Sequence, residues 1–317
     1  MKKFDVIAIG ELNVDLILNK IDGEPEIGKE KFARDMILTL GSSTAIFAAN
    51  VASLGTKTAF VGMIGQDSFG DLIKKSLASK NVNTDLLIET DKHASGATIV
   101  LSYDEDRANV TYQGAMDFMS FKDIDKTIFE ETRHIHISSI FMQSGIKQDL
   151  TDILSYALEK GATTSLDTQW DPTEKWDFDY AKILPNVSVF LPNEKELILL
   201  THSANIDEAI DKIKPYINIC VIKRGNQGSW MVLHGGAIHN LPPFLNKNVV
   251  DTIGAGDSFN SGFINQFIKG ESPEKCQQFG NLMGAINTTA SGGTGAFSSK
   301  ENIVKTAKET FKQTITL

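Results

Sequence analysis

The sequence predicts a doubly wound α/β fold, in which a mainly parallel β-sheet is flanked by helices and a small β-sheet lid is attached. Three observations support this prediction. The chain has 317 residues with 41% hydrophobic and 22% charged content, which is enough to bury a large core. Short apolar runs alternate with amphipathic helical segments over most of the chain. Two β-rich stretches interrupt that alternation.

The first element is expected to be a buried strand. Residues 4–10 form an apolar run that ends in glycine, as is typical of a strand inside a parallel sheet. The next segments, 16–19 and 31–40, are extended and half-polar, and a turn-rich stretch joins them. The first helix is expected only at 44–54, followed by Gly55 as its terminator. This order indicates that a β-layer is inserted after the first strand.

Regular alternation begins after this insertion. A strand at 58–61 precedes a helix at 69–80, whose start is marked by the capping residues Asp67 and Ser68. The alternation resumes beyond a second β-rich stretch. The later expected strands and helices are strands near 134–138, 163–166, 188–191 and 219–222, and helices near 147–160, 193–201 and 207–214.

The two β-rich stretches are expected to leave the main sheet and to form one lid. In the second stretch, strands at 98–103 and 109–113 flank the polar segment 104–107, which is typical of a hairpin. We assign the lid to residues 11–43 and 93–116. The α/β core then takes residues 1–10, 44–92 and 117–317.

Charge and composition narrow the partners. Lys and Arg number 31 against 40 Asp and Glu, a net charge of −9, which is the opposite of a nucleic-acid footprint and disfavours acidic membranes. No segment has the roughly 18 consecutive apolar residues of a membrane span, and acidic residues interrupt the apolar start of the chain. Cys220 and Cys276 are expected to be buried free thiols. We expect a cytoplasmic protein without nucleic-acid or membrane partners.

The densest candidate site is the segment 249–260. A strand is expected to end there in a loop of tiny residues, with a helix beginning at Asp257. Gly254, Ala255 and Gly256 leave room for an anion beside backbone N–H groups and the positive end of the helix dipole. The Asp257 carboxylate can accept the proton of an attacking substrate hydroxyl. The alternative is a tight turn in which Asp257 only caps the helix.

The sequence resembles the ribokinase-like family, the pfkB-type carbohydrate kinases, over nearly its whole length. Its strongest element, Asp251-Thr-Ile-Gly-Ala-Gly-Asp257, matches the DTxGAGD signature of that family. Four more elements occur in family order: Gly10-Glu-Leu-Asn-Val-Asp15, Val61-Gly-Met-Ile-Gly-Gln-Asp67 with Phe69-Gly70, Pro192-Asn-Glu-Lys-Glu196, and Lys223-Arg-Gly-Asn-Gln-Gly228. The resemblance implies an ATP-dependent kinase that transfers the γ-phosphoryl group to a hydroxyl of a small sugar or sugar acid.

The resemblance also implies roles for individual residues. Asp257 is the catalytic base, and Gly254, Ala255 and Gly256 form the anion hole for the transferred group. The residues that bind the sugar are Asn13, Asp15, Gly41, Ser42 and Asp257. The residues that bind ATP are Asn193, Lys223, Gly225, Gly228, Thr252, Gly254, Gly256 and Asn287. Separately, Arg107 near the hairpin tip is either a contact for a substrate anion or an exposed charge.

The same resemblance implies cofactors and an assembly. Mg²⁺ accompanies ATP, and Glu196 holds it through waters, as suits a hard cation that keeps part of its hydration shell. Some relatives bind a monovalent cation such as K⁺, and the corresponding residues here are Asp251, Thr252, Ser291 and Gly293. The core would carry the ATP and catalytic sites. A homodimer through the lid is expected, because a partner would cover its sheet edges.

Several departures from the family pattern bear on the acceptor. Ser42 replaces the second glycine of the family, and Ile46 replaces an asparagine and cannot hydrogen-bond a sugar. Phe141 and Met142 lie where a ribokinase would have a polar contact, and Gln169 replaces the Asn of a DxN segment. These departures argue against ribose itself. A nucleoside such as adenosine or inosine is the alternative acceptor, and a non-catalytic sugar-binding or nucleotide-binding regulator is a remote one.

Overall fold

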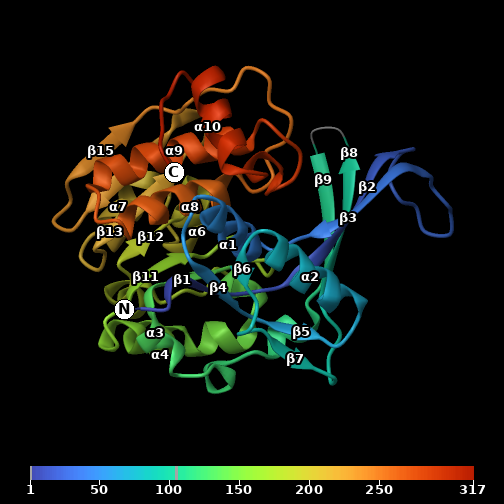
Figure 1. Ribbon diagram of the computed structural model, residues 1–317, viewed down its shortest axis with the longest axis horizontal. Coiled ribbons are helices and arrows are strands. Elements are labelled where there is room, and N and C mark those ends of the chain that lie inside the picture. The colour runs from blue at the N-terminus through green and yellow to red at the C-terminus, as the bar shows by residue number, and fades with distance from the viewer. Residues whose placement is uncertain (1, 104–105) are drawn as a thin grey trace.

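A large sheet forms the centre of the computed structural model, which describes residues 2–103 and 106–317 (Figure 1). Within these residues the sheet has nine strands in the order β15-β14-β13-β12-β11-β10-β1-β4-β6. The strands from β6 to β13 run parallel, and β14 and β15 are antiparallel at one edge. The bounds are β1 (Phe4–Ile9), β4 (Thr58–Val61), β6 (Val82–Asn83), β10 (Thr132–Ser138), β11 (Thr163–Asp167), β12 (Val189–Phe190), β13 (Ile219–Lys223), β14 (Ser229–Leu233) and β15 (Ile238–Leu241).

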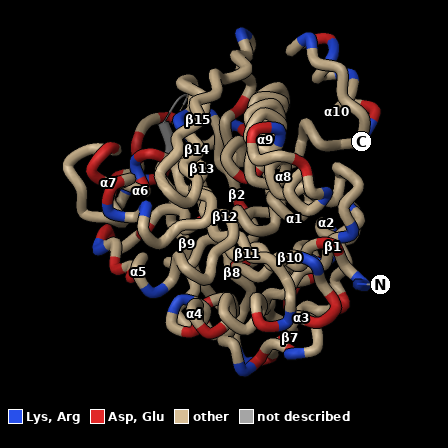
Figure 2. The backbone as a smooth tube through the Cα atoms, turned by 90° about the vertical axis from the view of Figure 1, so that its left-hand side faces the viewer, with Lys and Arg blue, Asp and Glu red and all other residues tan. Residues whose placement is uncertain are grey.

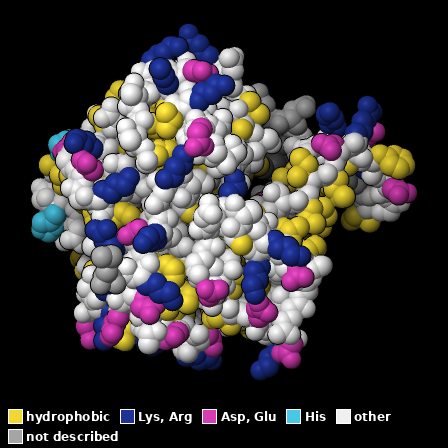
Figure 3. All heavy atoms as spheres, in the orientation of Figure 1, with side chains coloured by type: hydrophobic (Ala, Val, Ile, Leu, Met, Phe, Trp, Pro, Cys, Tyr) yellow, Lys and Arg dark blue, Asp and Glu magenta, His cyan; other side chains and the backbone are white. Residues whose placement is uncertain are grey.

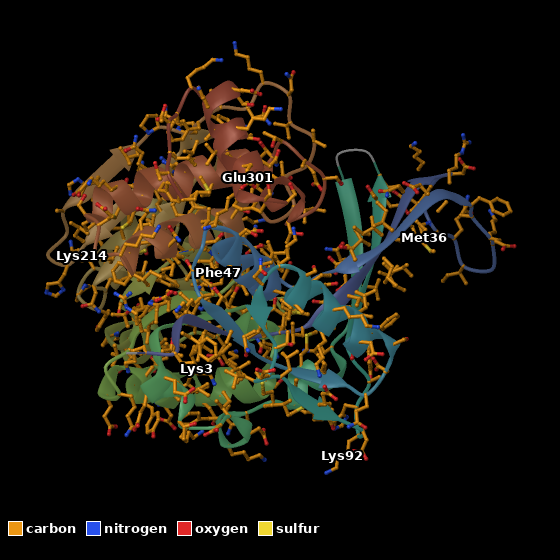
Figure 4. All side chains as sticks on the ribbon, viewed as in Figure 1. Lys3, Met36, Phe47, Lys92, Lys214 and Glu301 are labelled. Atoms are coloured by element: carbon orange, nitrogen blue, oxygen red, sulfur yellow. The ribbon has the colours of Figure 1, made fainter. Side chains whose placement is uncertain are left out.

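Helices cover both faces of this sheet, and alternate residues of β1 show why. Ile7 and Ile9 belong to one apolar cluster, which includes α4 and α7, whereas Val6 and Ala8 belong to another, which includes α1 and α8. Phe47 of α1, labelled in Figure 4, is fully buried in the second cluster. The predicted doubly wound fold is therefore confirmed. The helices are α1 (Ser43–Ser53), α2 (Ser68–Ser79), α3 (Ile128–Glu131), α4 (Ser144–Glu159), α5 (Tyr180–Ile183), α6 (Glu194–Leu200), α7 (Ile206–Ile213), α8 (Ala255–Phe267), α9 (Pro273–Asn287) and α10 (Lys300–Glu309).

The small sheet is separate and projects from the body in Figure 1. Its order is β3-β2-β8-β9, in which the chain-distant strands β2 and β8 pair in parallel. This confirms a second small sheet, while the proposed lid boundaries stay a prediction. The strands are β2 (Asn13–Ile21), β3 (Ala33–Leu40), β8 (Gly96–Tyr103) and β9 (Asp106–Tyr112). A two-stranded pair of β5 (Met63–Gly65) and β7 (Ile88–Thr90) was not predicted.

The start of α8 differs from the prediction. The helix begins at Ala255 instead of Asp257, and Gly254 is its N-cap with a left-handed backbone, φ +73°. That backbone is open to glycine because it has no Cβ. Val249 and Val250 form no strand and are exposed. Asp257 therefore lies in the first turn of α8, and it is not the residue that caps the helix.

Charges and cysteines follow the sequence expectations. Figure 2 shows basic and acidic positions interspersed over outer helices such as α4 and α7. Cys220 and Cys276 are both buried and free, and burial raises the pKa of each thiol, that of Cys276 to about 12. No helix in the described part of the chain combines the length and apolar character needed to cross a membrane.

Candidate active site

The site lies where parallel strands end. β11 ends at Asp167 and β13 at Lys223, and the N-terminus of α8 points to the same edge of the sheet. Ligands of open α/β sheets bind outside the carboxyl ends of the strands. Two adjoining cavities occur here, and Val100 and Ile253 line both. The arrangement therefore offers two neighbouring binding spaces at one helix N-terminus.

The smaller cavity has a volume of about 200 Å³ and a polar wall. It contains the predicted sugar contacts Asn13, Asp15 and Ser42. Nδ2 of Asn13 donates to Oδ1 of Asp15 over 2.9 Å and to Oγ1 of Thr98 over 3.0 Å, which ties β2 to β8. The remaining lining residues are Glu11, Ser43, Thr98, Asn109, Thr111, Met116 and Met142, with the two shared residues.

Gly41 supports this wall from behind. A Cβ at this position would lie 2.2 Å from Oδ1 of Asp15 and 2.5 Å from Nδ2 of Asn13. Only glycine leaves room for that close approach. The backbone N–H of Gly41 also donates to the carbonyl of Asn13 over 3.0 Å. Gly41 thus holds the two polar side chains in place without itself lining the cavity.

Glu11 is a site residue that the sequence reasoning missed. It is 4% exposed, lines the smaller cavity and accepts hydrogen bonds from the backbone N–H and the hydroxyl of Thr44. Burial raises the pKa of its carboxyl. Its position between Gly10 and Asn13, directly after β1, was the available signal.

The larger cavity has a volume of about 1290 Å³ and gathers most of the predicted nucleotide contacts. The predicted residues that line it are Asn193, Glu196, Lys223, Gly225, Gly228, Asp251, Thr252, Gly254, Ala255, Gly256, Asp257 and Ser291. The predicted contact Asn287 is fully buried instead. Its Nδ2 donates to the carbonyl of Ile253 over 2.6 Å, and its Oδ1 accepts from Ser258, so it supports the loop from behind.

Asp257 lies between oppositely charged neighbours. It is 5% exposed, and Nε2 of Gln169 donates to its Oδ1 over 3.0 Å. Burial raises the pKa of Asp257 to about 8, repulsion from Asp167 adds to the rise, and the Lys223 ammonium opposes it. A carboxylate with a raised pKa beside a helix N-terminus can accept a proton as a hydroxyl attacks.

Lys223 connects this carboxylate to the anion loop. Its Nζ donates to Oδ2 of Asp167 over 2.6 Å, and it lies 3.5 Å from where a Cβ of Gly256 would be. Attraction to Asp167 and Glu196 outweighs burial and raises the pKa of Lys223. A lasting positive charge therefore borders the N-terminus of α8, where a phosphate would be stabilised.

Asn193 and Glu196 form a reciprocal cap at the start of α6. The backbone N–H of Asn193 donates to Oε2 of Glu196 over 2.9 Å, and the N–H of Glu196 donates to Oδ1 of Asn193 over 2.8 Å. Burial, followed by repulsion from Asp167, raises the pKa of Glu196 to about 7. This cap fixes one carboxylate on the wall of the larger cavity.

The residues expected at a monovalent cation are close together. The Asp251 carboxylate accepts from the backbone N–H groups of Ile253 and Gly292, each within 2.9 Å, and so joins the loop before α8 to the loop after α9. The carbonyl of Thr252 accepts from Ala255, and that of Gly293 accepts from Asn50.

Two predicted contacts on other elements have different outcomes. Arg107 belongs to β9 opposite Ser102, and its side chain lies outside the described residues. Ile46 is 6% exposed and lines neither cavity. It packs against Gly293 and Gly254, within 3.0 Å of where a Cβ of either would lie. The predicted apolar wall residue is thus a spacer between two loops of the larger cavity.

The family of the chain follows from comparison with known proteins. Residues 3–300 match the pfkB family of carbohydrate kinases, so the chain belongs to this family. The predicted enzyme class, a phosphotransferase that acts on an alcohol group of a carbohydrate, is confirmed at that level.

Individual relatives agree with this membership. An uncharacterized sugar kinase of Archaeoglobus fulgidus is 30% identical over 235 residues, covering 74% of this chain and 92% of that protein. A 5-dehydro-2-deoxygluconokinase of Lacticaseibacillus casei is 27% identical over 299 residues and 90% of each chain. The structure of Arabidopsis thaliana ribokinase with ribose and ATP is similar with a TM-score of 0.81 at 23% identity, covering 95% of this chain and 98% of that one. The predicted ribokinase-like fold is therefore confirmed.

Proposed function

We propose that this carbohydrate kinase transfers the γ-phosphoryl group of ATP to a hydroxyl of a small, uncharged sugar, with Asp257 as the base. The observation that carries the proposal is the position of Asp257. Its buried carboxylate lies at the N-terminus of α8, in the larger cavity, next to the smaller polar one. A sugar in the smaller cavity and the phosphates of ATP in the larger one would meet at this carboxylate.

The reaction follows from these positions. Asn13 and Asp15 hold sugar hydroxyls and orient one of them toward Asp257. Asp257 takes the proton of that hydroxyl as its oxygen attacks the γ-phosphorus and the bond to the β-phosphate breaks. The N–H groups from Gly254 to Gly256, the dipole of α8 and the Lys223 ammonium stabilise the negative charge on the transferred group.

Metal ions fit the larger cavity as companions of the nucleotide. Glu196 offers one fixed carboxylate there, which suits Mg²⁺ held chiefly by phosphate oxygens and waters. Bound Mg²⁺ would supply neutralisation of the phosphate charge. K⁺ would be held near Asp251, Thr252, Ser291 and Gly293, where two loops already meet.

The polar wall favours an uncharged sugar over a sugar acid. Glu11, Asp15 and Asp257 bring three carboxylates to the acceptor space, and carboxylates accept hydrogen bonds from hydroxyls but repel anions. We expect kcat/KM for the best neutral sugar to exceed that for its uronic or aldonic acid by at least about 100-fold, roughly 3 kcal/mol. Coupled ADP assays on matched pairs measure this ratio. Equal rates for acid and neutral forms would contradict the expectation.

The size of the smaller cavity separates sugars from nucleosides. At about 200 Å³ it is smaller than the pockets of roughly 300 Å³ and more that hold drug-sized ligands. A pentose or hexose suits this space better than a nucleoside such as adenosine. The small sheet would close over the sugar and exclude water, because β2 and β8 supply one wall of the cavity.

Replacement of Asp257 by Asn tests the proposal. The amide keeps the shape but cannot take the proton, so kcat should fall by at least about 1000-fold while ATP still binds. ADP release with Mg-ATP across a panel of hexoses, pentoses, sugar acids and nucleosides measures the loss. Asp152→Asn, on the exposed side of α4, is the matched control. Unchanged turnover in D257N would refute the assignment, and a response limited to nucleosides would favour a nucleoside kinase.

We also propose where and in what form the enzyme works. Two buried free thiols and a need for ATP suit the reducing cytoplasm. A homodimer through the small sheet is supported by apolar side chains on its outer face, which Figure 3 shows on the projecting part of the molecule. The division into an α/β core and a lid belongs to the same proposal.

A further inference from the structure

Gln169 has an unusual backbone at the edge of the site. It follows the last residue but one after β11, and its φ is +58°, in the left-handed region that favours glycine. Side-chain-bearing residues in this region are uncommon and cluster at functional sites. The side chain of Gln169 lines the larger cavity. Its conformation therefore calls for an explanation in what the side chain contacts.

The amide of Gln169 bridges two carboxylates. Its Nε2 donates to Oδ1 of Asp257 over 3.0 Å and to Oδ2 of Asp167 over 3.1 Å. A primary amide nitrogen carries two hydrogens, so each carboxylate receives one. The same Oδ2 of Asp167 accepts from Lys223 over 2.6 Å and from Asn260 over 2.5 Å. Asp167 is thus anchored in the core, and Gln169 attaches the mobile end of Asp257 to that anchor.

This bridge opposes the repulsion between the two carboxylates. Donated hydrogen bonds favour the ionised form of a carboxylate, whereas a nearby negative charge disfavours it. The groups that face the Asp257 carboxylate from the packed elements are Asp167 of β11, Lys223 of β13, Glu11 after β1 and Ser43 of α1. Among them, two are negative and raise the cost of ionisation. A second donor at Asp257 therefore has a large effect on its charge state.

We infer that Gln169 is a positioning residue, whose amide orients the Asp257 carboxylate and favours its ionised form so that it can accept the proton of the acceptor hydroxyl. The inference rests on the proposed role of Asp257 as the base. It also gives a consequence to the replacement of the family's Asn, since the bridge here is made by a side chain that is one methylene longer.

Two variants remove the bridge in different ways. Gln169→Leu deletes the donor and keeps much of the volume, and Gln169→Glu keeps the shape but adds a negative charge. We expect the acid limb of the kcat/KM profile to move to higher pH by about one unit in Q169L and further in Q169E. At neutral pH kcat should fall at least about tenfold, with partial recovery as pH rises. ATP affinity should change less than about twofold, because Gln169 contacts no predicted nucleotide contact other than Asp257.

A readout that needs no turnover separates this inference from the proposed function. The carbon-13 signal of the Asp257 carboxyl, assigned by its loss in D257N, reports the apparent pKa of Asp257 directly. A midpoint that is higher in Q169L and Q169E than in the wild type supports the inference even if no acceptor has been found. Gln148→Leu, at an exposed position of α4, should leave both the midpoint and the kinetics unchanged.

The inference is overturned by one clear result. If both variants fold, as judged by thermal unfolding, and the Asp257 midpoint and the acid limb stay at their wild-type values, Gln169 does not position the base. A wild-type enzyme that transfers no phosphoryl group to any acceptor would instead refute the proposed function, whatever the carbon-13 titration shows.

Discussion

Asp257 carries a stability cost that accompanies its proposed role. Its pKa is raised from 3.8 to about 8, first by burial and then by repulsion from Asp167. Between these two values the folded state keeps a proton that the unfolded chain releases. The free energy of unfolding therefore falls as pH rises through this window, and the full cost is present above about 8.

Asp257→Asn should relieve this cost and stabilise the protein at alkaline pH. The gain in Tm over the wild type should be small near the lower end of the window and reach at least about 2 °C near its upper end. Thermal unfolding at a series of pH values measures the difference. A gain that does not grow with pH would contradict the link between burial of this carboxyl and stability.

Ile46 illustrates what single residues do not reveal in the sequence. Its type correctly indicated that it makes no hydrogen bond, but its place could not be predicted, because the loop carrying Gly293 lies far along the chain. In the structure it separates Gly254 from Gly293. Glu11 was missed for a related reason: a buried carboxylate needs partners such as Thr44, and those come from another segment.

At the scale of elements, local signals predicted what local physics determines. The side chain of Asp67 accepts from Gly70 at the start of α2, as expected of a capping residue, and β1 alternates its side chains between two cores. The start of α8 was displaced by two residues because the left-handed backbone of Gly254 is set by its fit against Gly293. The parallel pairing of β2 with β8 joins segments about 80 residues apart, and no local pattern shows it.

The ion pair between Lys223 and Asp167 links the ends of β13 and β11. Asp167 is fully buried, and the Lys223 side chain is 12% exposed, so removal of the lysine leaves an uncompensated buried charge. Lys223→Met should lower the free energy of unfolding by about 3 kcal/mol or more. Urea denaturation measures the loss.

A second substitution provides the control for this pair. Asp167→Asn in the K223M background removes the stranded charge and should restore at least about 1 kcal/mol of the lost stability. Lys74→Met, which breaks the exposed pair with Glu89, should cost less than about 1 kcal/mol. Equal losses in K223M and K74M would mean that the buried pair is not special.

At the scale of the whole molecule, the two faces of the small sheet differ in chemistry. Asp15, Ile17 and Asn19 of β2 face the two cavities. The alternate residues of the sheet therefore face outward, and they are apolar. The outward residues are Leu16, Leu18, Met36, Leu38, Ile99, Leu101, Val110 and Tyr112. Met36 and Val110 are each 64% exposed, and Met36 is labelled on the projecting sheet in Figure 4.

A second copy of the chain is the partner that best fits this face. A contiguous apolar surface on a projecting sheet costs free energy in water, and an identical sheet offers a matching apolar surface about a two-fold axis. We expect a particle of twice 34.7 kDa in light scattering at micromolar concentration. Val110→Lys would place a charge in the buried centre of the interface and should yield monomers.

The same contact would connect assembly with catalysis. β2 supplies Asn13 and Asp15 to the smaller cavity with one set of side chains and the outer face with the other, so a sheet held by a partner also holds the sugar contacts. V110K should therefore raise KM for the sugar by at least about threefold with a smaller change in kcat. Leu158→Lys, on α4, is the matched control, because Leu158 is also exposed but far from the small sheet. A wild type that is monomeric under these conditions, or a V110K variant that remains dimeric, would rule out this interface.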